Sequence, residues 1–278
     1  RPMSPDERSY SVLMSVYERD QPDYVDDAIR SMVEQSEPFT DLVVVCDGPV
    51  GAGLDAVIER WRGELGERLR VHRLAANRGL AGALRAGLPL CRTERVARMD
   101  ADDVSRPRRC ELLLDAMNCR GLDLVGGFIS EFDRTPGDMA SVREVPLERE
   151  DIVAFAKRRN PFNHVSVMFR RPAVLAAGGY RDIHLLEDYD LWVRMLMDGC
   201  ACANIPRVVV DVRTGAGMYG RRSSLRYLKE QWRFFRRLRS EGFVSRGQEA
   251  VALAARSAAT LMPAGAVKRA YGLVLRRR

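Results

Sequence analysis

Short apolar runs alternate with amphipathic stretches over the first part of the chain. Four runs have the length and the polar borders of buried strands, namely Tyr10–Val16, Leu42–Cys46, Leu69–Leu74 and Arg95–Met99. The stretches between them carry apolar residues at helical spacing, such as Val25, Ile29, Met32 and Val33. Because strands and helices alternate in this way, we predict a parallel, doubly wound sheet whose ligands bind beyond the carboxyl ends of its strands.

Later segments predict further elements, so we expect an α/β fold with a mixed, mainly parallel sheet flanked by helices. The additional strands are expected at 124–132, 142–145, 165–169 and 206–211. The additional helices are expected at 148–157 and 185–197. This pattern predicts one globular body over residues 1–219.

The character of the chain changes after residue 219. An apolar stripe along an arginine-rich helix is formed by Leu225, Leu228, Trp232, Phe235 and Leu238. Residues 220–278 contain 15 basic and 3 acidic residues, whereas residues 1–219 contain 30 basic and 35 acidic residues. This basic amphipathic extension predicts an anionic partner, either a membrane surface or nucleic acid. The alternative is that its helices pack on the body or on a second copy of the chain as a homodimer, because residues 249–262 are rich in alanine.

Composition bounds the class of protein. With 278 residues and 46% hydrophobic content, the chain can bury a full core. It has no apolar run near the ~20 residues that a membrane-spanning helix needs, and its first residues are polar and charged. Its six cysteines lack the spacing of a metal site, so we expect reduced thiols and a cytoplasmic location.

The most informative stretch is Arg98-Met-Asp-Ala-Asp-Asp, which follows the fourth predicted strand. Three carboxylates in four residues repel one another and raise one another's pKa unless a cation lies between them. A hard divalent ion accepts one or two carboxylates together with the phosphates of a substrate. The alternative is an acidic turn that caps a helix near Pro107.

Polar residues also follow the first two strands, at Ser15–Glu18 and at Asp47. Because the carboxyl ends of parallel strands meet at one edge of a sheet, these residues and the acidic stretch are expected to form a single site.

Five segments together resemble glycosyltransferase family 2, the inverting enzymes with the GT-A fold. They are Ser11–Tyr17, Val44–Gly48, Asn77–Leu84, Arg98–Asp103 and Glu187–Arg194. The resemblance runs from about Tyr10 to Met218, and two further segments, 157–164 and 212–222, resemble bacterial exopolysaccharide and O-antigen enzymes of the amylovoran type. It implies a catalytic domain at 1–219, with a nucleotide-sugar half at 10–104 and an acceptor half at 105–219.

The chain departs from the family pattern at two positions of the nucleotide side. Cys46 stands where an aspartate commonly precedes Asp47, and Glu18 stands where asparagine is frequent. The signature of processive polysaccharide synthases is absent, so we expect the transfer of one sugar at a time.

The resemblance implies roles for residues on the donor side. Asp102 would bind Mn²⁺ or Mg²⁺, and Asp100 would hold the ribose or share the metal through water. Asp47 would accept the N3–H of uracil, which favours a UDP-sugar, because the ring nitrogen of cytosine carries no proton there. The remaining nucleotide-sugar contacts would come from Ser15, Val16, Tyr17, Glu18, Arg78, Arg98 and Ala101. For Arg78, the alternative is a solvated side chain without a ligand.

The resemblance places the catalytic base at Asp188, which would take the proton of the acceptor hydroxyl. Glu187 would support it or contact the sugar, and the alternative is that both carboxylates stabilise a helix N-terminus. His164 is either structural or near the acceptor. Trp192 would either stack on the acceptor sugar or, as its helical spacing favours, pack in the core. Asp190 is expected to point elsewhere.

A glycine-rich segment after the last predicted strand suits a loop that closes over the diphosphate. Its candidate ligands, for which solvated charges are the alternative, are Arg213, Tyr219, Arg221 and Arg222.

We therefore expect a metal-dependent inverting glycosyltransferase that moves a sugar from a UDP-sugar to a glycan on a polyprenyl diphosphate. The basic extension predicts a peripheral protein at the inner face of the cell membrane. A nucleotidyltransferase of sugar phosphates is a second hypothesis, although it would carry a glycine-rich phosphate loop after the first strand. A nucleic-acid-binding protein is a third hypothesis, but nucleic acid would not explain the acidic site.

Overall fold

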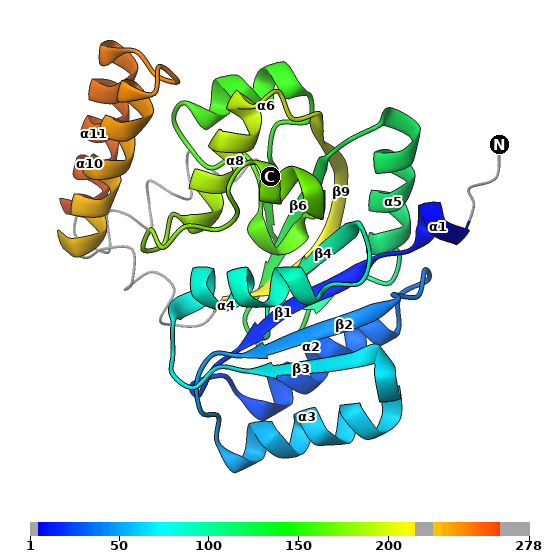
Figure 1. The fold of residues 1–278 in the computed structure, drawn as a ribbon. Coiled ribbons are helices and arrows are strands. Elements are labelled where there is room, and N and C mark those ends of the chain that lie inside the picture. Colours follow the sequence, from blue (N-terminus) through cyan, green and yellow to red (C-terminus); the bar gives the residue numbers. More distant parts are fainter. Residues whose placement is uncertain (1–4, 215–224, 262–278) are drawn as a thin grey trace.

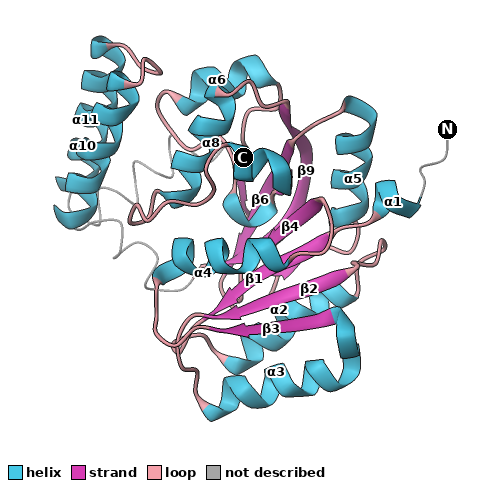
Figure 2. Ribbon diagram, in the orientation of Figure 1, coloured by secondary structure: helices cyan, strands magenta, loops and turns pink. Residues whose placement is uncertain are grey.

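A computed structural model describes residues 5–214 and 225–261 of the chain. Its centre is one curled sheet with the strand order β3-β2-β1-β4-β8-β6-β9-β5, with β7 paired to β6 (Figure 1). The strands are β1 (Ser11–Val16), β2 (Asp41–Cys46), β3 (Leu69–Arg73), β4 (Arg95–Met99), β5 (Val104–Ser105), β6 (Leu124–Phe132), β7 (Ser141–Arg143), β8 (Met168–Arg170) and β9 (Cys202–Arg213). The helices that flank the sheet are distinguished from it in Figure 2.

The first four strands form the predicted parallel half of the sheet. β1 lies between β2 and β4, with Leu13 opposite Val43 on one side and Arg98 on the other. The strand direction reverses at β8, which is antiparallel to β4. The rest of the sheet contains both parallel and antiparallel pairs. The predicted mixed α/β sheet is therefore confirmed.

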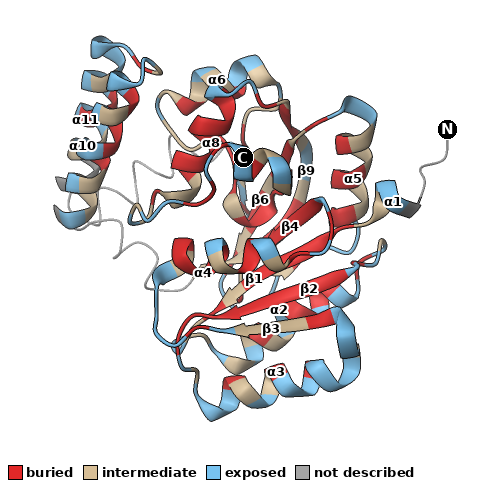
Figure 3. Cartoon of the chain, in the orientation of Figure 1, coloured by how far each residue is buried: buried red, intermediate tan, exposed pale blue. Residues whose placement is uncertain are grey.

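Helices cover both faces of the sheet. Successive strand residues point to opposite faces, so each strand contributes side chains to both helix layers. Val12 and Met14 pack with one set of helices, whereas Leu13 packs with the other set. The first set is α2 (Pro22–Val33), α3 (Ala52–Leu65) and α5 (Arg109–Arg120). The second set is α4 (Gly79–Gly87), α6 (Arg149–Ala156), α7 (Arg171–Ala176), α8 (Glu187–Met197) and the C-terminal helices α10 (Leu225–Ser240) and α11 (Arg246–Leu261). Figure 3 shows the buried strands between these layers.

Short elements complete the described chain. They are α1 (Pro5–Arg8) and the 3₁₀ turns η1 (Gly66–Arg68), η2 (Leu88–Leu90) and η3 (His164–Ser166). Helix α4 lies very close to the sheet, since a Cβ at Gly87 would come within 2.5 Å of Val45 Cγ2. Only glycine allows this approach.

Two predicted strands differ from the structure in their bounds. The apolar run 165–169 begins as η3 because the Ser166 N–H donates to Asn163 O at 2.8 Å, so β8 starts only at Met168. The last strand begins at Cys202 rather than at Pro206 and accommodates the proline where the pairing of β6 and β9 shifts register. Proline lacks the N–H of a ladder bond, so an irregular position suits it.

The C-terminal helices pack on the body through α8. Phe234 and Phe235 join the core beside Tyr189, with ring centroids of Tyr189 and Phe234 4.8 Å apart. Phe235 and Leu238 are 0% and 1% exposed, so these two residues of the predicted apolar stripe face the protein and not a membrane. The packing alternative thus describes residues 225–261, because the aromatic rings find apolar partners on α8.

Within the described ranges 5–214 and 225–261, the structure holds no helix with both the length and the apolar character needed to cross a bilayer. Residues 262–278 of the basic extension lie outside these ranges.

Candidate active site

The carboxyl ends of β1, β2 and β4 meet at one edge of the sheet. Val16 pairs with Cys46, and Met14 pairs with Met99, so the residues that follow these strands start side by side. The structure therefore brings together the three polar groups that the sequence analysis assigned to one site.

Asp47 connects two of the loops at this edge. Its side chain is buried, and its Oδ1 atom accepts the backbone N–H of Arg78 at 2.6 Å. Its own N–H donates to Val16 O at 2.8 Å. Gly48 lies against the backbone of Asn77, where a Cβ would come within 2.7 Å of the amide nitrogen. The two nucleotide-side candidates Asp47 and Arg78 are thus connected directly by a hydrogen bond.

The loop after β1 carries the other nucleotide-side candidates. Ser15 and Tyr17 are half-buried, Val16 is buried, and Glu18 is exposed. The Tyr17 N–H donates to Asp20 Oδ2 at 2.9 Å, which closes this loop into a turn.

The acidic turn after β4 separates its three carboxylates. Asp100 is half-buried and accepts a hydrogen bond from the Arg98 guanidinium, whereas Asp102 is exposed, and Ala101 between them is buried. Asp103 is buried and accepts the backbone N–H of Arg213 at 2.9 Å. Burial, followed by the charges of Asp100 and Asp102, raises the pKa of Asp103 well above its ordinary value.

This donor set fits a metal that is completed by a substrate. Among the described residues, no group of three or more His, Cys, Asp or Glu side chains forms a ready cation cage. Mg²⁺-type ions commonly bind through one or two carboxylates plus substrate phosphates. The exposed Asp102 and the half-buried Asp100 match that kind of site, since both carboxylates lie on one turn at the sheet edge.

Arg98 lies at the centre of the site. Its side chain is 0% exposed, and its charge acts on Asp103, His164, Tyr180 and Glu187. A buried arginine of this kind links the acidic turn after β4 with the start of α8, two segments that are far apart in sequence.

Glu187 and Asp188 open helix α8. Burial and the adjacent Asp188 charge raise the pKa of Glu187 to about 7. The Asp188 carboxylate is held at both oxygens, because Tyr189 N–H donates to Oδ1 at 2.7 Å and Asn160 Nδ2 donates to Oδ2 at 2.5 Å. The two neighbouring carboxylates therefore differ, since Asp188 is oriented and Glu187 is prone to protonation.

Sequence reasoning assigned no role to Asn160. Its Oδ1 accepts the Phe162 N–H at 3.3 Å, which leaves the amide nitrogen to face Asp188. The segment 157–164 was part of the family resemblance, and the pairing of asparagine with a following proline could have marked a fixed turn. The contact of this turn with Asp188 could not be predicted, because Asn160 and Asp188 are 28 positions apart.

His164 of η3 lies beside Trp192 of α8, with ring centroids 6.0 Å apart. Nε2 of His164 is hydrogen-bonded to the Tyr180 hydroxyl at 3.0 Å, and burial, with the Arg98 charge, lowers the pKa of His164 to about 4. The histidine is therefore neutral at pH 7. Trp192 is 0% exposed and packs edge-on to Phe162, with centroids 5.8 Å apart. Its stacking on a sugar is ruled out in this structure, and the core-packing alternative describes it.

Asp190 points away from this site. It is 1% exposed and pairs with Arg194 at 2.8 Å and with Arg237 of α10. Asp190, which was expected to point elsewhere, thus connects the C-terminal helices to α8.

Of the four candidates for a diphosphate loop, only Arg213 is described; Tyr219, Arg221 and Arg222 lie outside the described residues. The Arg213 guanidinium lies 3.8 Å from the Tyr24 ring centroid and 4.6 Å from that of Phe132, and its Nε donates to Asp102 O at 3.2 Å. Arg213 therefore lies beside the acidic turn, with its side chain between two aromatic rings.

Comparisons with known proteins identify the family and the fold. Residues 11–177 match the family described as Glycosyl transferase family 2. The chain is 35% identical over 239 residues to the UDP-Gal:alpha-D-GlcNAc-diphosphoundecaprenol beta-1,3-galactosyltransferase of Escherichia coli, covering 84% of this chain and 86% of that protein. It is 36% identical over 239 residues to the amylovoran biosynthesis glycosyltransferase AmsE of Erwinia amylovora, covering 84% and 88%.

Two solved structures share the fold at low sequence identity. TarS 1-349 of S. aureus in complex with UDP-GlcNAc has a TM-score of 0.66 at 14% identity, covering 96% of this chain and 76% of that one. The mannosyltransferase PcManGT from Pyrobaculum calidifontis, in complex with GDP-Man and Mn²⁺, has a TM-score of 0.60 at 19% identity, covering 100% and 85%. At these identities the likeness establishes the fold alone.

The family resemblance seen in the sequence is confirmed, because the match spans more than half of the chain and the relatives exceed 30% identity over most of their length. The chain therefore belongs to glycosyltransferase family 2, and it is a glycosyltransferase with the GT-A fold.

Proposed function

We propose that this glycosyltransferase is metal-dependent and inverting, and that it moves one sugar from a UDP-sugar to a glycan carried on a polyprenyl diphosphate, in surface polysaccharide synthesis. The observation that carries the proposal is the convergence of two acidic segments, after β4 and at the start of α8, around the buried Arg98. A transfer between a charged donor and a hydroxyl acceptor needs both a charge-stabilising group and a base.

The names of the relatives support the choice of substrates. The E. coli relative acts with UDP-Gal on a diphosphoundecaprenol-linked sugar, by its name, and the Erwinia relative belongs to amylovoran biosynthesis. Asp47 at the end of β2 is buried beside the loop of Arg78, where a carboxylate suits the N3–H of uracil.

Asp102 and Asp100 would hold Mn²⁺ or Mg²⁺ together with the diphosphate. The bound ion would act as a Lewis acid on the leaving oxygens. Arg98 would balance the carboxylate of Asp100 from the protein side, and Arg213 would keep the acidic turn in place through its bond to the Asp102 carbonyl.

On the acceptor side, Asp188 would take the hydroxyl proton as that oxygen attacks the anomeric carbon and UDP leaves. Asn160 would orient the carboxylate, since it donates to Oδ2. Glu187, with a pKa of about 7, would carry only part of a negative charge at neutral pH. Asp188 would then be the stronger base of the pair.

We place the enzyme on the cytoplasmic face of the membrane, peripherally bound, because a polyprenyl-linked acceptor is membrane-bound. The basic composition of α10 supports this location, since the helix contains six basic residues and one acidic residue.

The test is UDP release from a panel of UDP-sugars with Mn²⁺ or with EDTA, for the wild type and for Asp102→Ala. We expect metal-dependent release from one donor and its loss in Asp102→Ala, and the anomeric configuration of the product reports inversion. Turnover of other nucleotides with metal, and of no UDP-sugar, would contradict the proposed donor. A released sugar phosphate in place of UDP would favour nucleotidyl transfer.

A further inference from the structure

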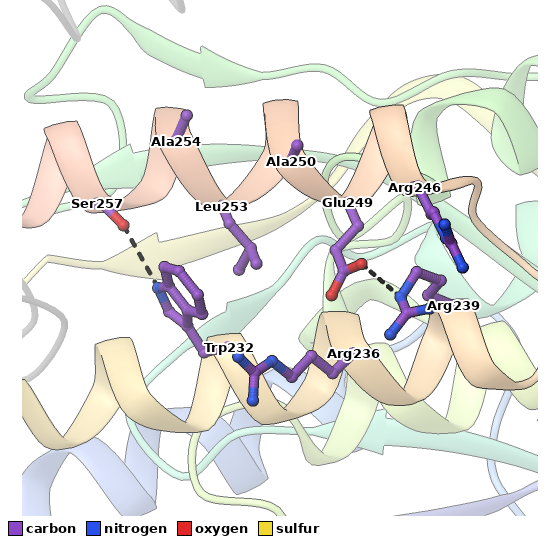
Figure 4. A pocket seen from close by; sticks show the side chains of 9 residues that line it. All are labelled: Trp232, Arg236, Arg239, Arg246, Glu249, Ala250, Leu253, Ala254 and Ser257. Carbon is purple, nitrogen blue, oxygen red and sulfur yellow. Dashed lines mark hydrogen bonds and ion pairs between the residues drawn. The ribbon is translucent and has the colours of Figure 1, made fainter.

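A groove runs along the outer side of the C-terminal helix pair, between α10 and α11 (Figure 4). Its walls are bridged at two points. Trp232 Nε1 donates to Ser257 Oγ at 3.4 Å, and Arg239 pairs with Glu249 at 2.6 Å. Leu253 of α11 lies between the two bridges. The groove is therefore a built feature that both helices form.

The groove carries excess positive charge. Glu249 neutralises Arg239, whereas Arg236 of α10 and Arg246 of α11 have no carboxylate partner among the described residues. Both arginines are exposed and line the groove from different helices, Arg236 beside Trp232 and Arg246 beside Arg239 (Figure 4). A guanidinium group without a counter-ion can bind phosphate oxygens through its N–H donors.

The groove also has an apolar component beside its charges. Trp232 is 41% exposed, and the Arg236 guanidinium lies 5.7 Å from its ring centroid. Ala250 and Ala254 are exposed on α11 next to the buried Leu253. An exposed tryptophan beside arginines is typical of the interface between lipid headgroups and acyl chains.

The opposite side of α10 is already occupied. Phe234 and Phe235 pack against Tyr189, and Arg237 pairs with Asp190 of the base-bearing helix α8. Within residues 5–214 and 225–261, the body packs against the inner side of the helix pair, and the outer side carries the exposed Trp232, Arg236 and Arg246.

We propose that this groove binds the phosphate headgroup of an anionic membrane lipid, with Arg236 and Arg246 as the phosphate ligands and Trp232 in the interfacial layer. The inference rests on the peripheral location proposed above and deepens it. Of the predicted apolar stripe it keeps Trp232, whereas Phe235 and Leu238 face the protein. Nucleic acid also attracts arginine, but the neighbouring Trp232, Ala250 and Ala254 suit acyl chains better than a phosphate backbone.

The fluorescence of the full chain tests the groove directly. The chain has three tryptophans, of which Trp61 and Trp192 are 4% and 0% exposed, so Trp232 dominates any response to solvent. We expect a blue shift of its emission with phosphatidylcholine vesicles that contain phosphatidylglycerol, and no shift with phosphatidylcholine alone. Vesicle binding without a change in Trp232 emission would show attachment through other residues and would overturn the proposal.

Charge variants assign the ligands. Two surface charges near an anionic membrane contribute roughly 25-fold by attraction alone, at about fivefold each. Replacing both Arg236 and Arg246 by glutamine should weaken binding to anionic vesicles by more than this, because it also removes their hydrogen bonds to phosphate. A matched pair on the body, Arg62→Gln with Arg85→Gln, removes the same charge and should change binding about twofold or less. A second pair, Arg226→Gln with Lys229→Gln, removes the same charge from α10 outside the groove. Equal losses in the groove pair and in either control pair would mean diffuse attraction and would overturn the groove.

Two further measurements distinguish lipid from nucleic acid, and the groove from the catalytic site. Duplex DNA that shifts Trp232 emission more strongly than anionic vesicles would assign the groove to nucleic acid, and inorganic phosphate alone should produce no shift. The groove variants should keep the UDP-sugar hydrolysis of the wild type, because Arg236 and Arg246 lie outside the catalytic site. Loss of lipid binding with intact hydrolysis therefore supports the groove independently of the proposed reaction.

Discussion

Two acidic segments of this chain look alike in sequence and differ in the structure. The first lies in the turn after β4 and the second in the first turn of α8. Their carboxylates are Asp100, Asp102 and Asp103, and Glu187, Asp188 and Asp190, respectively. In the turn, the middle carboxylate is exposed and the last is buried. On the helix, the last carboxylate is buried in an ion pair, the middle one is oriented by Asn160, and the first is half-buried with a raised pKa.

The difference follows from the backbone that carries each segment. An irregular turn can direct two carboxylates to one side, where a substrate can share a cation with them. A helix rotates successive residues by about 100°, so three acidic residues in four positions point to different surroundings. Similar acidic patterns therefore place two carboxylates on one turn, where they can share a cation, but put the three carboxylates of the helix in different surroundings.

The largest effect is expected at Asp188. Asp188→Asn keeps the shape of the side chain but cannot take a proton, so kcat should fall by about 10²–10⁴-fold with nearly unchanged UDP binding. Initial rates of transfer and a UDP titration measure both quantities. The control is Asp198→Asn at the other, exposed end of α8, which should keep wild-type rates. A variant Asp188→Asn with more than about a tenth of wild-type kcat would remove this residue from the role of base.

At Asp190 the same kind of substitution should act on stability. Asp190→Asn leaves Arg194 and Arg237 without their buried counter-ion, so the free energy of unfolding should fall by about 3–5 kcal/mol. Urea unfolding measures the loss. Asp102→Asn, at an exposed carboxylate, should cost about 0.5 kcal/mol or less while it impairs metal-dependent turnover. Equal stability losses at the two positions would erase the contrast between the segments.

Asn160→Ala should have a smaller effect on turnover. It removes one hydrogen bond to the Asp188 carboxylate, so kcat should fall about tenfold at an unchanged KM for the donor. A double-mutant cycle gives the sharper measurement. In the Asp188→Asn background, Asn160→Ala should cost almost nothing further, because the two residues act as a unit. Additive losses would mean that Asn160 acts elsewhere.

The smallest effect concerns Glu187 and pH. Its pKa is about 7 in the folded chain and about 4.5 when the chain unfolds, so between these values the folded state holds a proton that the unfolded state has released. Stability from this group therefore falls as pH rises from about 4.5 to 7. Glu187→Gln should remove that fall, so from pH 5 to pH 8 its free energy of unfolding should rise relative to the wild type by at most about 3 kcal/mol. Unfolding at pH 5 and pH 8 measures this; a pH-independent difference would contradict the raised pKa.

The apolar pattern predicted the parallel half of the sheet well. Runs such as Leu42–Cys46 are short, β-branched and buried on both faces, and no competing structure suits them. The pattern was less reliable near residue 165, where the Ser166 side chain and backbone bind Asn163 and shorten the strand. Local side-chain hydrogen bonds of this kind compete with strand pairing and leave little mark on hydrophobic periodicity.

The C-terminal stripe shows the same limit for a helix. Periodicity predicted that Phe235 and Leu238 share a face, and they do, but it could not decide what covers that face. Lipid and protein are both apolar, so the stripe suits either. The structure decides for protein because Tyr189 and Asp190 on α8 offer an aromatic surface and a charge partner for α10.

The strand ends that meet at the donor edge and the two acidic segments could be predicted, because they depend on residues that are close along the chain. The hydrogen bond of Asn160 to Asp188, and the ion pair of Arg237 with Asp190 across 47 residues, became visible only in the fold. Contacts at such separations depend on how helices and loops pack around the sheet, and the periodicity of any one segment carries no information about its partner.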